Sequence, residues 1–509
     1  MKKLLILALV ASFVLGAAIT AKADTEVKIS GRMDFAIGWM DNYDFGDRLN
    51  DVSEDGFVTR ERVRTQFEFI ANENVRGVLQ FEIGESAFGN PNARFDLSGD
   101  GVNVETKHAY LQFNIPNTDL LVSIGLQALT VPGVWGSQVF DDDVAALVMS
   151  YPINDMFTVV AFWARPYDLN SDTDNTQNGT SLRTVQNEWD EYDLFGLLVP
   201  ITVKGVLNVT PYFLYGTLGC DVVGSVAGGT ISGRNEAQGL LSLGPLTNQF
   251  NAARDLFDSE NLETWWAGMN FKLTYFDPFT FAFDVIYGDV WDNDEILQRE
   301  GWFFAAEAAY KMDFMTIALG GWYGTGEDGD PTNGSERFPT ARPSFKPTSM
   351  GFDGSSLLGT GSFSELMSQG YGDNGGTWGL VLALRNISFI DDLTHTLRVA
   401  YYQGTNSPGC LHDDSAAFGP YVNYAYGNMN MIMLTSKDFA WEINFDHKYQ
   451  IYENLAAYCE MGMVDITRSK KPWTDRTNRI WDNTYNWAAA KEWKTDTAWK
   501  LAFGLRYDF

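Results

Sequence analysis

Hydrophobic and polar residues alternate along much of this chain. From Val27 to Trp39 the odd-numbered positions are apolar except for Gly31, and positions 28, 30, 32 and 34 are Lys, Ser, Arg and Asp. A period of two residues is typical of a β-strand with one face in an apolar and the other in an aqueous environment. The pattern returns in segments 59–71, 76–84 and 499–509. The sequence therefore predicts an all-β chain of amphipathic strands.

The connections between these strands alternate in length. Short turns, rich in Asn, Asp or Pro, are expected near 72–75, 116–119, 152–155, 276–278, 311–313, 390–392 and 452–454. Long polar stretches separate the other pairs, at 41–58, 86–103, 166–188, 217–261, 326–375, 404–437 and 467–494. This asymmetry is typical of a transmembrane antiparallel β-barrel with short periplasmic turns and long outer loops. We predict about 18 strands, with 16 as the alternative because segments 189–201 and 376–388 are weakly patterned, and a secreted β-sandwich as the rival fold.

The first residues predict export from the cytoplasm. Lys2 and Lys3 precede an apolar run over residues 4–18, and Ala21-Lys22-Ala23 has the small residues of a cleavage site. We expect residues 1–23 to be a signal peptide and residues 24–509 to form a single barrel domain. No later segment has the 18 or so consecutive apolar residues that a transmembrane helix needs.

The last strand ends in an aromatic residue, Phe509. An apolar residue at every second position before a terminal aromatic resembles the signal that the outer-membrane barrel assembly machinery recognises. Ala502 departs from the usual form, because a polar residue is common there. We predict that Gly504, Tyr507 and Phe509 belong to this signal and that the protein is located in the bacterial outer membrane.

The chain is strongly acidic. Its formal charge of -30 becomes -33 once the three signal-peptide lysines are removed, which argues against nucleic acid as a partner. Acidic outer loops could bind a divalent cation, and residues 327–336 have acids and glycines as calcium loops do, but without EF-hand spacing. No other cofactor is expected. Cys220, Cys410 and Cys459 allow either one Cys220–Cys410 bridge or three free thiols.

One strand carries a row of charged residues on its inward face. If Val63 and Phe67 point outward, then Arg60, Arg62 and Arg64 form a ladder about 14 Å long at the rise of a β-strand, with Gln66 and Glu68 below it. Such a ladder could line a pore constriction. The alternative is that the arginines pair with acids on neighbouring strands, such as Glu82.

A second candidate for the constriction is the segment from Gln127 to Asp143. It is unusually apolar for a surface loop and ends in Asp141, Asp142 and Asp143 before a strand resumes at Val144. Folded into the lumen, it would place three acids opposite the arginine ladder. The alternative is a loop that covers the rim or a subunit contact.

Several stretches resemble the outer-membrane homotrimeric porins of sulfate-reducing bacteria. They are Gly125 to Gln127, Asp141 to Ala146, Ala161 to Tyr167, Arg62 to Glu68 and Glu73 to Val78. The likeness covers residues 27–167 and the C-terminus, while the middle and the outer loops match in layout only. The resemblance implies a general diffusion pore, with three barrels side by side and the third outer loop folded inward.

We therefore predict a porin for passive diffusion of small hydrophilic solutes and ions, and no enzyme. The histidines, His108, His395, His412 and His447, lie on separate segments, so neither a zinc site nor a Ser-His hydrolase is expected. The alternatives are a substrate-selective channel and a non-conducting adhesion or structural barrel.

The expected partners are further copies of the chain in a homotrimer, membrane lipid, lipopolysaccharide and the permeating solutes. The last outer loop is basic, so it could bind lipopolysaccharide phosphates or be simply solvated. Its basic residues are Arg468, Lys470, Lys471, Arg476 and Arg479.

Overall fold

The computed structural model describes residues 25–41, 56–86, 104–168, 191–219, 239–240, 261–293, 295–329, 333–352, 355–358, 376–411, 434–469 and 497–509. The predicted signal peptide, Cys220 and the side chain of Cys410 lie outside the described residues, as does most of the basic last loop. Within the described residues the strands are β1 (Glu26–Asp41), β2 (Gly56–Asn72), β3 (Val75–Ser86), β4 (Val104–Asn114), β5 (Leu121–Thr130), β6 (Asp141–Pro152), β7 (Thr158–Asp168), β8 (Glu191–Leu198), β9 (Ile201–Val203), β10 (Leu207–Gly219), β11 (Asn261–Leu273), β12 (Phe279–Trp291), β13 (Arg299–Lys311), β14 (Thr316–Gly324), β15 (Thr377–Ile390), β16 (Leu393–Gly404), β17 (Phe439–Tyr452), β18 (Leu455–Thr467) and β19 (Ala498–Asp508). The described residues also include two 3-10 helices, η2 (Glu295–Leu297) and η3 (Pro408–Leu411), which lie between strands.

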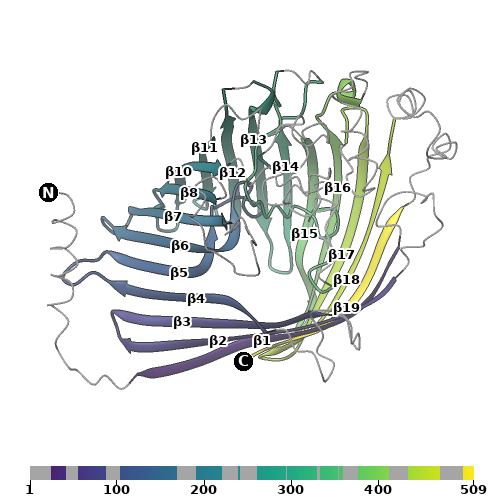
Figure 1. Cartoon of the computed structure of the whole chain (residues 1–509). Helices are drawn as coiled ribbons and strands as arrows, with labels where there is room; N and C mark the ends of the chain where they lie inside the picture. The colour runs from purple at the N-terminus through teal and green to yellow at the C-terminus, as the bar shows by residue number, and fades with distance from the viewer. Residues whose placement is uncertain are drawn as a thin grey trace, which may run out of the picture.

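The strands form one closed antiparallel barrel (Figure 1). Each strand pairs with its neighbours in the sequence, and β19 pairs with β1 from Arg32↔Asp508 to Asp41↔Trp499. Strands β8 and β9 both pair with β10 and occupy one position in the wall, interrupted at Pro200, which has no N–H for the ladder. The barrel therefore has 18 strands, as predicted, and both weakly patterned segments are part of it.

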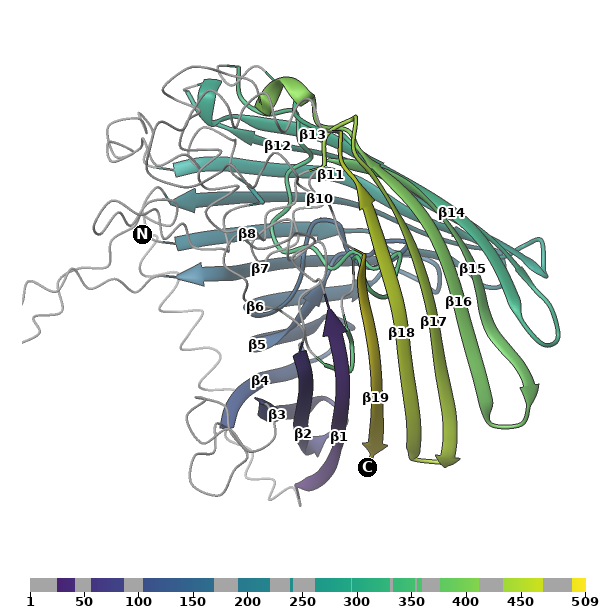
Figure 2. The ribbon, with the colours of Figure 1, turned by 90° about the vertical axis from the view of Figure 1, so that its right-hand side faces the viewer.

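The two ends of the barrel differ as expected. Short hairpins such as β15–β16 and β17–β18 lie at the same end as the C-terminus (Figure 2), and the strand ends from which the long connections start lie at the other. We call these the turn end and the outer end. No helix among the described residues is long and apolar enough to cross a membrane.

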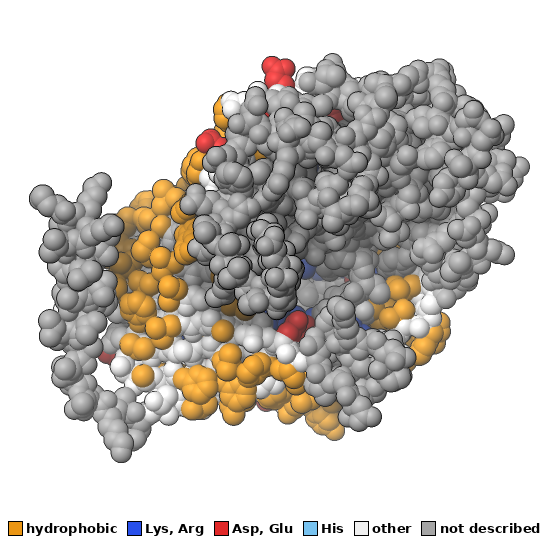
Figure 3. All heavy atoms as spheres, in the orientation of Figure 1, with side chains coloured by type: hydrophobic (Ala, Val, Ile, Leu, Met, Phe, Trp, Pro, Cys, Tyr) orange, Lys and Arg blue, Asp and Glu red, His pale blue; other side chains and the backbone are white. Residues whose placement is uncertain are grey.

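The outer surface carries an apolar belt between two groups of aromatic side chains. Figure 3 shows hydrophobic side chains across the face formed by β1 to β7. Exposed aromatics near the outer end are Trp39, Trp291, Trp302, Tyr323, Trp441 and Trp499. Exposed aromatics near the turn end are Tyr151, Tyr275, Phe276, Tyr310, Phe389, Tyr449, Tyr452 and Tyr507. Aromatic girdles at both interfaces, with an apolar band between them, are typical of an outer-membrane barrel.

The residues expected to face lipid or a neighbouring subunit are absent from the buried clusters of the described chain. They are Val63, Phe67, Leu79, Phe81, Ile83, Leu111, Phe113, Phe281, Phe283, Val285, Ile443, Phe445, Leu501 and Phe503. Leu111, Phe281 and Phe503 are among those that are clearly exposed.

An arginine in the middle of this belt should destabilise the barrel. Val285 lies at the centre of β12, between the inward-facing Asp284 and Ile286. Replacing Val285 with Arg is expected to lower the free energy of unfolding by about 2–4 kcal/mol, because a cation at the bilayer midplane loses its hydration. Urea unfolding in lipid vesicles measures this, with Val285→Leu as the apolar control. Equal stability of the two variants would place Val285 outside the lipid.

Two stretches of the described connections fold back into the barrel over ten or more residues. The first, the inner loop, comprises residues 131–140 between β5 and β6, and Val131, Val139 and Phe140 in it are completely buried. The second, the inner segment, comprises residues 333–352 and 355–358 between β14 and β15. The two run together through backbone hydrogen bonds, since Ser344 donates its N–H to Ser137 and Lys346 donates to Trp135.

Aromatic side chains fix both connections against the wall. Trp135 packs against Trp322 of β14 and Phe345, with ring centroids 6.2 and 6.0 Å apart. Phe352 packs against Trp322 at 5.2 Å and against Tyr402 of β16 at 5.0 Å. The main hydrophobic core therefore lies inside the barrel, between the wall and these connections.

The tip of the inner segment, residues 355–358, lies on a patch of small residues. Leu357 and Leu358 form a buried cluster with Ala36 and Ala502. Gly38 and Gly504 are part of the same patch, because a Cβ added to them would lie 2.7 Å from Leu358 and 2.8 Å from Leu357. A polar side chain in place of Ala502 would enter this contact, which explains why the last strand departs from the usual pattern there.

Candidate functional site

The predicted arginine ladder lies on the inner wall of β2, and each arginine has a different environment. The Arg60 guanidinium donates to the carbonyl oxygens of Ser356 and Leu357, both at 3.4 Å. Arg62 lies 3.4 Å from the Asp34 carboxylate of β1. Arg64 binds Glu82 of β3. The sequence left open whether the arginines line the pore or pair with acids on neighbouring strands, and Arg64 pairs with the acid named there.

A chain of ion pairs connects the ladder to the acidic cluster along the wall. Glu82 binds Arg64 and lies 3.8 Å from Lys107 of β4, which in turn binds Asp143 of β6. Lys107 is the extra residue of a β-bulge, between the pairs Gln80↔His108 and Phe81↔Thr106. A bulge changes the direction of a side chain, so no regular alternation predicts where Lys107 points.

The three aspartates differ from the prediction in position and direction. They are the first residues of β6, paired with Ala128 to Thr130 of β5, so the strand does not begin at Val144 and the loop is shorter than 127–143. Successive strand residues point to opposite faces. Asp142 accordingly binds Arg342 of the inner segment at 3.1 Å, while Asp141 accepts a hydrogen bond from Thr130.

The aspartates do not face the arginines across the lumen. Strands β2 to β6 follow one another in the wall, so both clusters lie on the same part of the barrel. Glu68, also assigned to the constriction, lies near the turn end, 3.6 Å from Arg76, and accepts a hydrogen bond from Gln66. Charges of both signs therefore alternate along one wall, instead of facing each other as two opposed groups.

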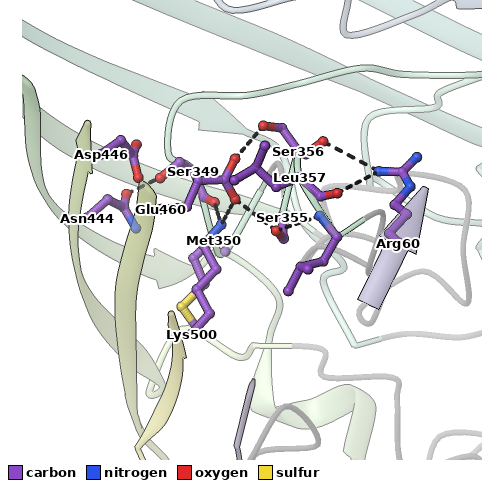
Figure 4. A network of polar contacts seen from close by, with 12 residues as sticks. Arg60, Ser349, Met350, Ser355, Ser356, Leu357, Asn444, Asp446, Glu460 and Lys500 are labelled. Atoms are coloured by element: carbon purple, nitrogen blue, oxygen red, sulfur yellow. Dashed lines mark hydrogen bonds and ion pairs between the residues drawn. The ribbon is translucent and has the colours of Figure 1, made fainter. Parts of the chain in front are cut away.

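A polar network attaches the inner segment to the part of the wall formed by β18, β19 and β2 (Figure 4). Glu460 of β18 accepts hydrogen bonds from the hydroxyls of Ser355 and Ser356 and lies 3.2 Å from the Lys500 ammonium. Lys500 also donates to the carbonyl oxygen of Ser349. The side chain of Lys500 is completely buried, so this ion pair is shielded from water.

Glu442 and Asn444 of β17 attach the same segment a little further along. Glu442 accepts the backbone N–H groups of Met350 and Gly351, each at 3.0 Å, and Asn444 accepts that of Ser349 at 3.1 Å. Carboxylates that accept two backbone N–H groups fix a loop at a defined position.

Further ion pairs continue the charged wall on β13 to β19. Arg385 of β15 binds both oxygens of Glu307 on β13. Arg398 of β16 lies 2.6 Å from Asp446 of β17, and Arg506 of β19 lies 2.6 Å from Asp34. On β7 to β12 the inward side chains are mostly apolar, including Ala164, Leu194, Leu214, Trp266 and Ile286, with Asp284 as an exception. More of the ion pairs of the inner wall therefore lie on β1 to β6 and β13 to β19, although buried apolar side chains occur there as well.

The sequence alone did not predict two features of the interior and one of the outer surface. The inner segment was assigned to a long outer loop, although Phe338, Phe345 and Phe352 give it the same apolar character that singled out the inner loop. The basic residues of the strands after β2 number at most two to a strand and form no local motif. His395 and His447 are not scattered, because the β16–β17 register brings their Nδ1 atoms within 2.6 Å.

Comparisons with known proteins find similarity of fold only. No family model and no curated protein matches the sequence. Among solved structures, OccK9 (OpdG) of Pseudomonas aeruginosa matches with a TM-score of 0.50 and 10% identity, over 95% of this chain and 98% of that one. The outer membrane protein OprD of the same organism gives 0.49 and 11%, over 96% of both chains. OmpT, an outer membrane protein of Vibrio cholerae, gives 0.38 and 12%, over 95% of this chain and 99% of that one, in a loop-deletion mutant. The chain therefore has the fold of outer-membrane β-barrels.

Proposed function

We propose that this protein is an outer-membrane porin through which small hydrophilic solutes and ions diffuse passively. The proposal rests on one combined observation: a closed barrel with an apolar belt between aromatic girdles outside and a wall of ion pairs inside. A lipid-facing exterior places the barrel in a membrane, and charged side chains in its interior need water or polar solutes beside them. Step conductance of the purified protein in a planar bilayer tests this function, and a folded barrel without conductance would support an adhesion or structural role.

The ion-paired wall makes ion preference sensitive to single charges. Arg64 has 27% of its side chain exposed and shares Glu82 with Lys107. Replacing Glu82 with Gln leaves Arg64 without this acidic partner and Lys107 with Asp143 alone, so it should shift selectivity toward anions, whereas Arg64→Gln should shift it toward cations. The reversal potential under a KCl gradient measures both shifts, which must have opposite signs.

Lys28→Gln provides the matched control. Lys28 and its partner Glu26 lie at the turn end and are 61% and 63% exposed, so salt and water screen their charges. We expect its reversal potential to equal that of the parent. If Arg64→Gln and Glu82→Gln behave like this control, the wall between β2 and β6 is not part of the conducting path.

A substrate-selective channel is the second candidate. The inner loop and inner segment bring side chains from opposite parts of the barrel close together, as when Trp135 donates its indole N–H to Glu307 at 2.8 Å. A narrowed path beside fixed charges is a feature that a selective channel needs. Saturation of the conductance by one solute would favour this candidate over general diffusion.

Assembly into a homotrimer, and a relationship to the porins of sulfate-reducing bacteria, rest on the sequence resemblance alone. The mass of the native particle in detergent distinguishes one barrel from three. Lipopolysaccharide and the barrel assembly machinery are further proposed partners. The first rests on the basic last loop, and the second on the C-terminal signal that includes Gly504, Tyr507 and Phe509.

A further inference from the structure

Three carboxylates gather at the outer end of the barrel, where the connection after β14 begins. Glu327 and Asp328 follow β14, and Glu336 lies at the start of the inner segment. One oxygen from each of the three lies within 4.8 Å of the others. Calcium binds oxygen at roughly 2.4 Å, so two ligands on opposite sides of one ion are up to about 4.8 Å apart. The spacing therefore fits a single shared Ca²⁺.

Surrounding hydrogen bonds hold these residues in place without the help of a cation. Glu327 donates its backbone N–H to Asn406, and Asp328 donates its own to the Glu336 carboxylate, both at 3.0 Å. The Ser335 hydroxyl donates to Glu327 Oε2 at 2.8 Å. Ser335 itself is bound to β13 through backbone hydrogen bonds to Gln298 and from Glu300.

A second observation points to a ligand at this position. Glu327 is only 2% exposed, and its Oε1 atom is buried with no hydrogen-bond partner among the described residues. A buried carboxylate oxygen without a donor is costly, because this oxygen has lost its water and no hydrogen-bond donor has replaced it. The nearby Arg337 offsets one of the three negative charges, which leaves an excess that matches a divalent cation.

We propose that Glu327, Asp328 and Glu336 bind one divalent cation of the Ca²⁺ class. The bound ion would connect the outer end of β14 with the start of the inner segment, beside Asn406 on the connection after β16. Ca²⁺ should bind more tightly than Mg²⁺, because Mg²⁺ requires shorter bonds and near-ideal octahedral geometry and gives up its water reluctantly.

Calorimetric titration of the folded full-length protein, freed of metal with EDTA, tests the site. The parent should bind one Ca²⁺ per chain in a saturable step, with weaker binding of Mg²⁺. Replacing the half-buried Glu336 with Gln keeps its volume and should weaken Ca²⁺ binding about tenfold or more, since affinity follows the number of charged ligands. Ca²⁺ should also raise the unfolding temperature of the parent and have little effect on that of the variant.

Glu263→Gln is the control, because it removes the same charge from an exposed position at the outer end of β11. It should bind Ca²⁺ as the parent does. Absence of a saturable step in the parent would overturn the proposal even if Glu336→Gln failed to fold. Equal affinities in Glu336→Gln and Glu263→Gln would overturn it as well, by showing that the ion binds elsewhere on this acidic protein.

Discussion

Replacing Lys500 with Met is expected to lower the free energy of unfolding by about 3–5 kcal/mol, because the change leaves a buried carboxylate without its cation. The Lys500 side chain is completely buried, and its partner Glu460 is 10% exposed. The hydroxyls of Ser355 and Ser356 still donate to Glu460 in the variant, but neutral donors do not balance its charge. Urea unfolding of the protein folded in detergent or lipid vesicles measures the loss.

A double variant distinguishes the loss of stability caused by the unpaired charge from the loss caused by poorer packing. Glu460→Gln in addition to Lys500→Met removes both charges and keeps an oxygen for the serine hydroxyls, so much of the lost stability should return. Lys28→Met is the control, since its exposed pair with Glu26 contributes little. If Lys500→Met and Lys28→Met unfold at the same urea concentration, the Lys500–Glu460 pair is solvated and the interior there is open to water.

Negative charges at the tip of the inner segment should detach the tip from β1 and β19, while the strands of the barrel stay paired. Leu357 and Leu358 are 3% and 4% exposed and together contribute about 3–6 kcal/mol to docking, at the usual value for a buried leucine. The double variant Leu357→Asp with Leu358→Asp replaces this gain by the cost of burying two carboxylates. Step conductance in a planar bilayer should rise, because the tip no longer occupies the lumen beside β1 and β19.

The strand ladder of the same variant should be intact, since neither leucine takes part in it. Electrophoretic mobility with and without heating should therefore match that of the parent and report a folded barrel. Leu357→Met with Leu358→Met is the control, because methionine nearly conserves the volume and the apolar contact. Parental conductance in the folded aspartate variant would contradict the idea that the tip narrows the pore.

The sequence by itself determined which side of the clearly alternating strands meets lipid and which end of the barrel carries the loops. The first follows from the period of two along strands such as β1 and β19, because neighbouring side chains must point to opposite faces. The second follows from loop length, since antiparallel neighbours at one end need only a few turn residues. The inward direction of Arg60, Arg62 and Arg64 was predicted for the same local reason.

Only the tertiary structure decided what these side chains meet. Arg60 donates to a carbonyl oxygen 297 positions away, and Lys500 to one 151 positions away, so no local pattern could pair them. The bulge at Lys107 and the start of β6 at Asp141 decide where the charged side chains between Arg64 and Asp143 point. Both features depend on the register with a neighbouring strand, which the sequence does not specify. Alternation along a strand is a local property. By contrast, the side chains that fill the barrel come from connections far away in the sequence, and their positions depend on the part of the wall against which they pack.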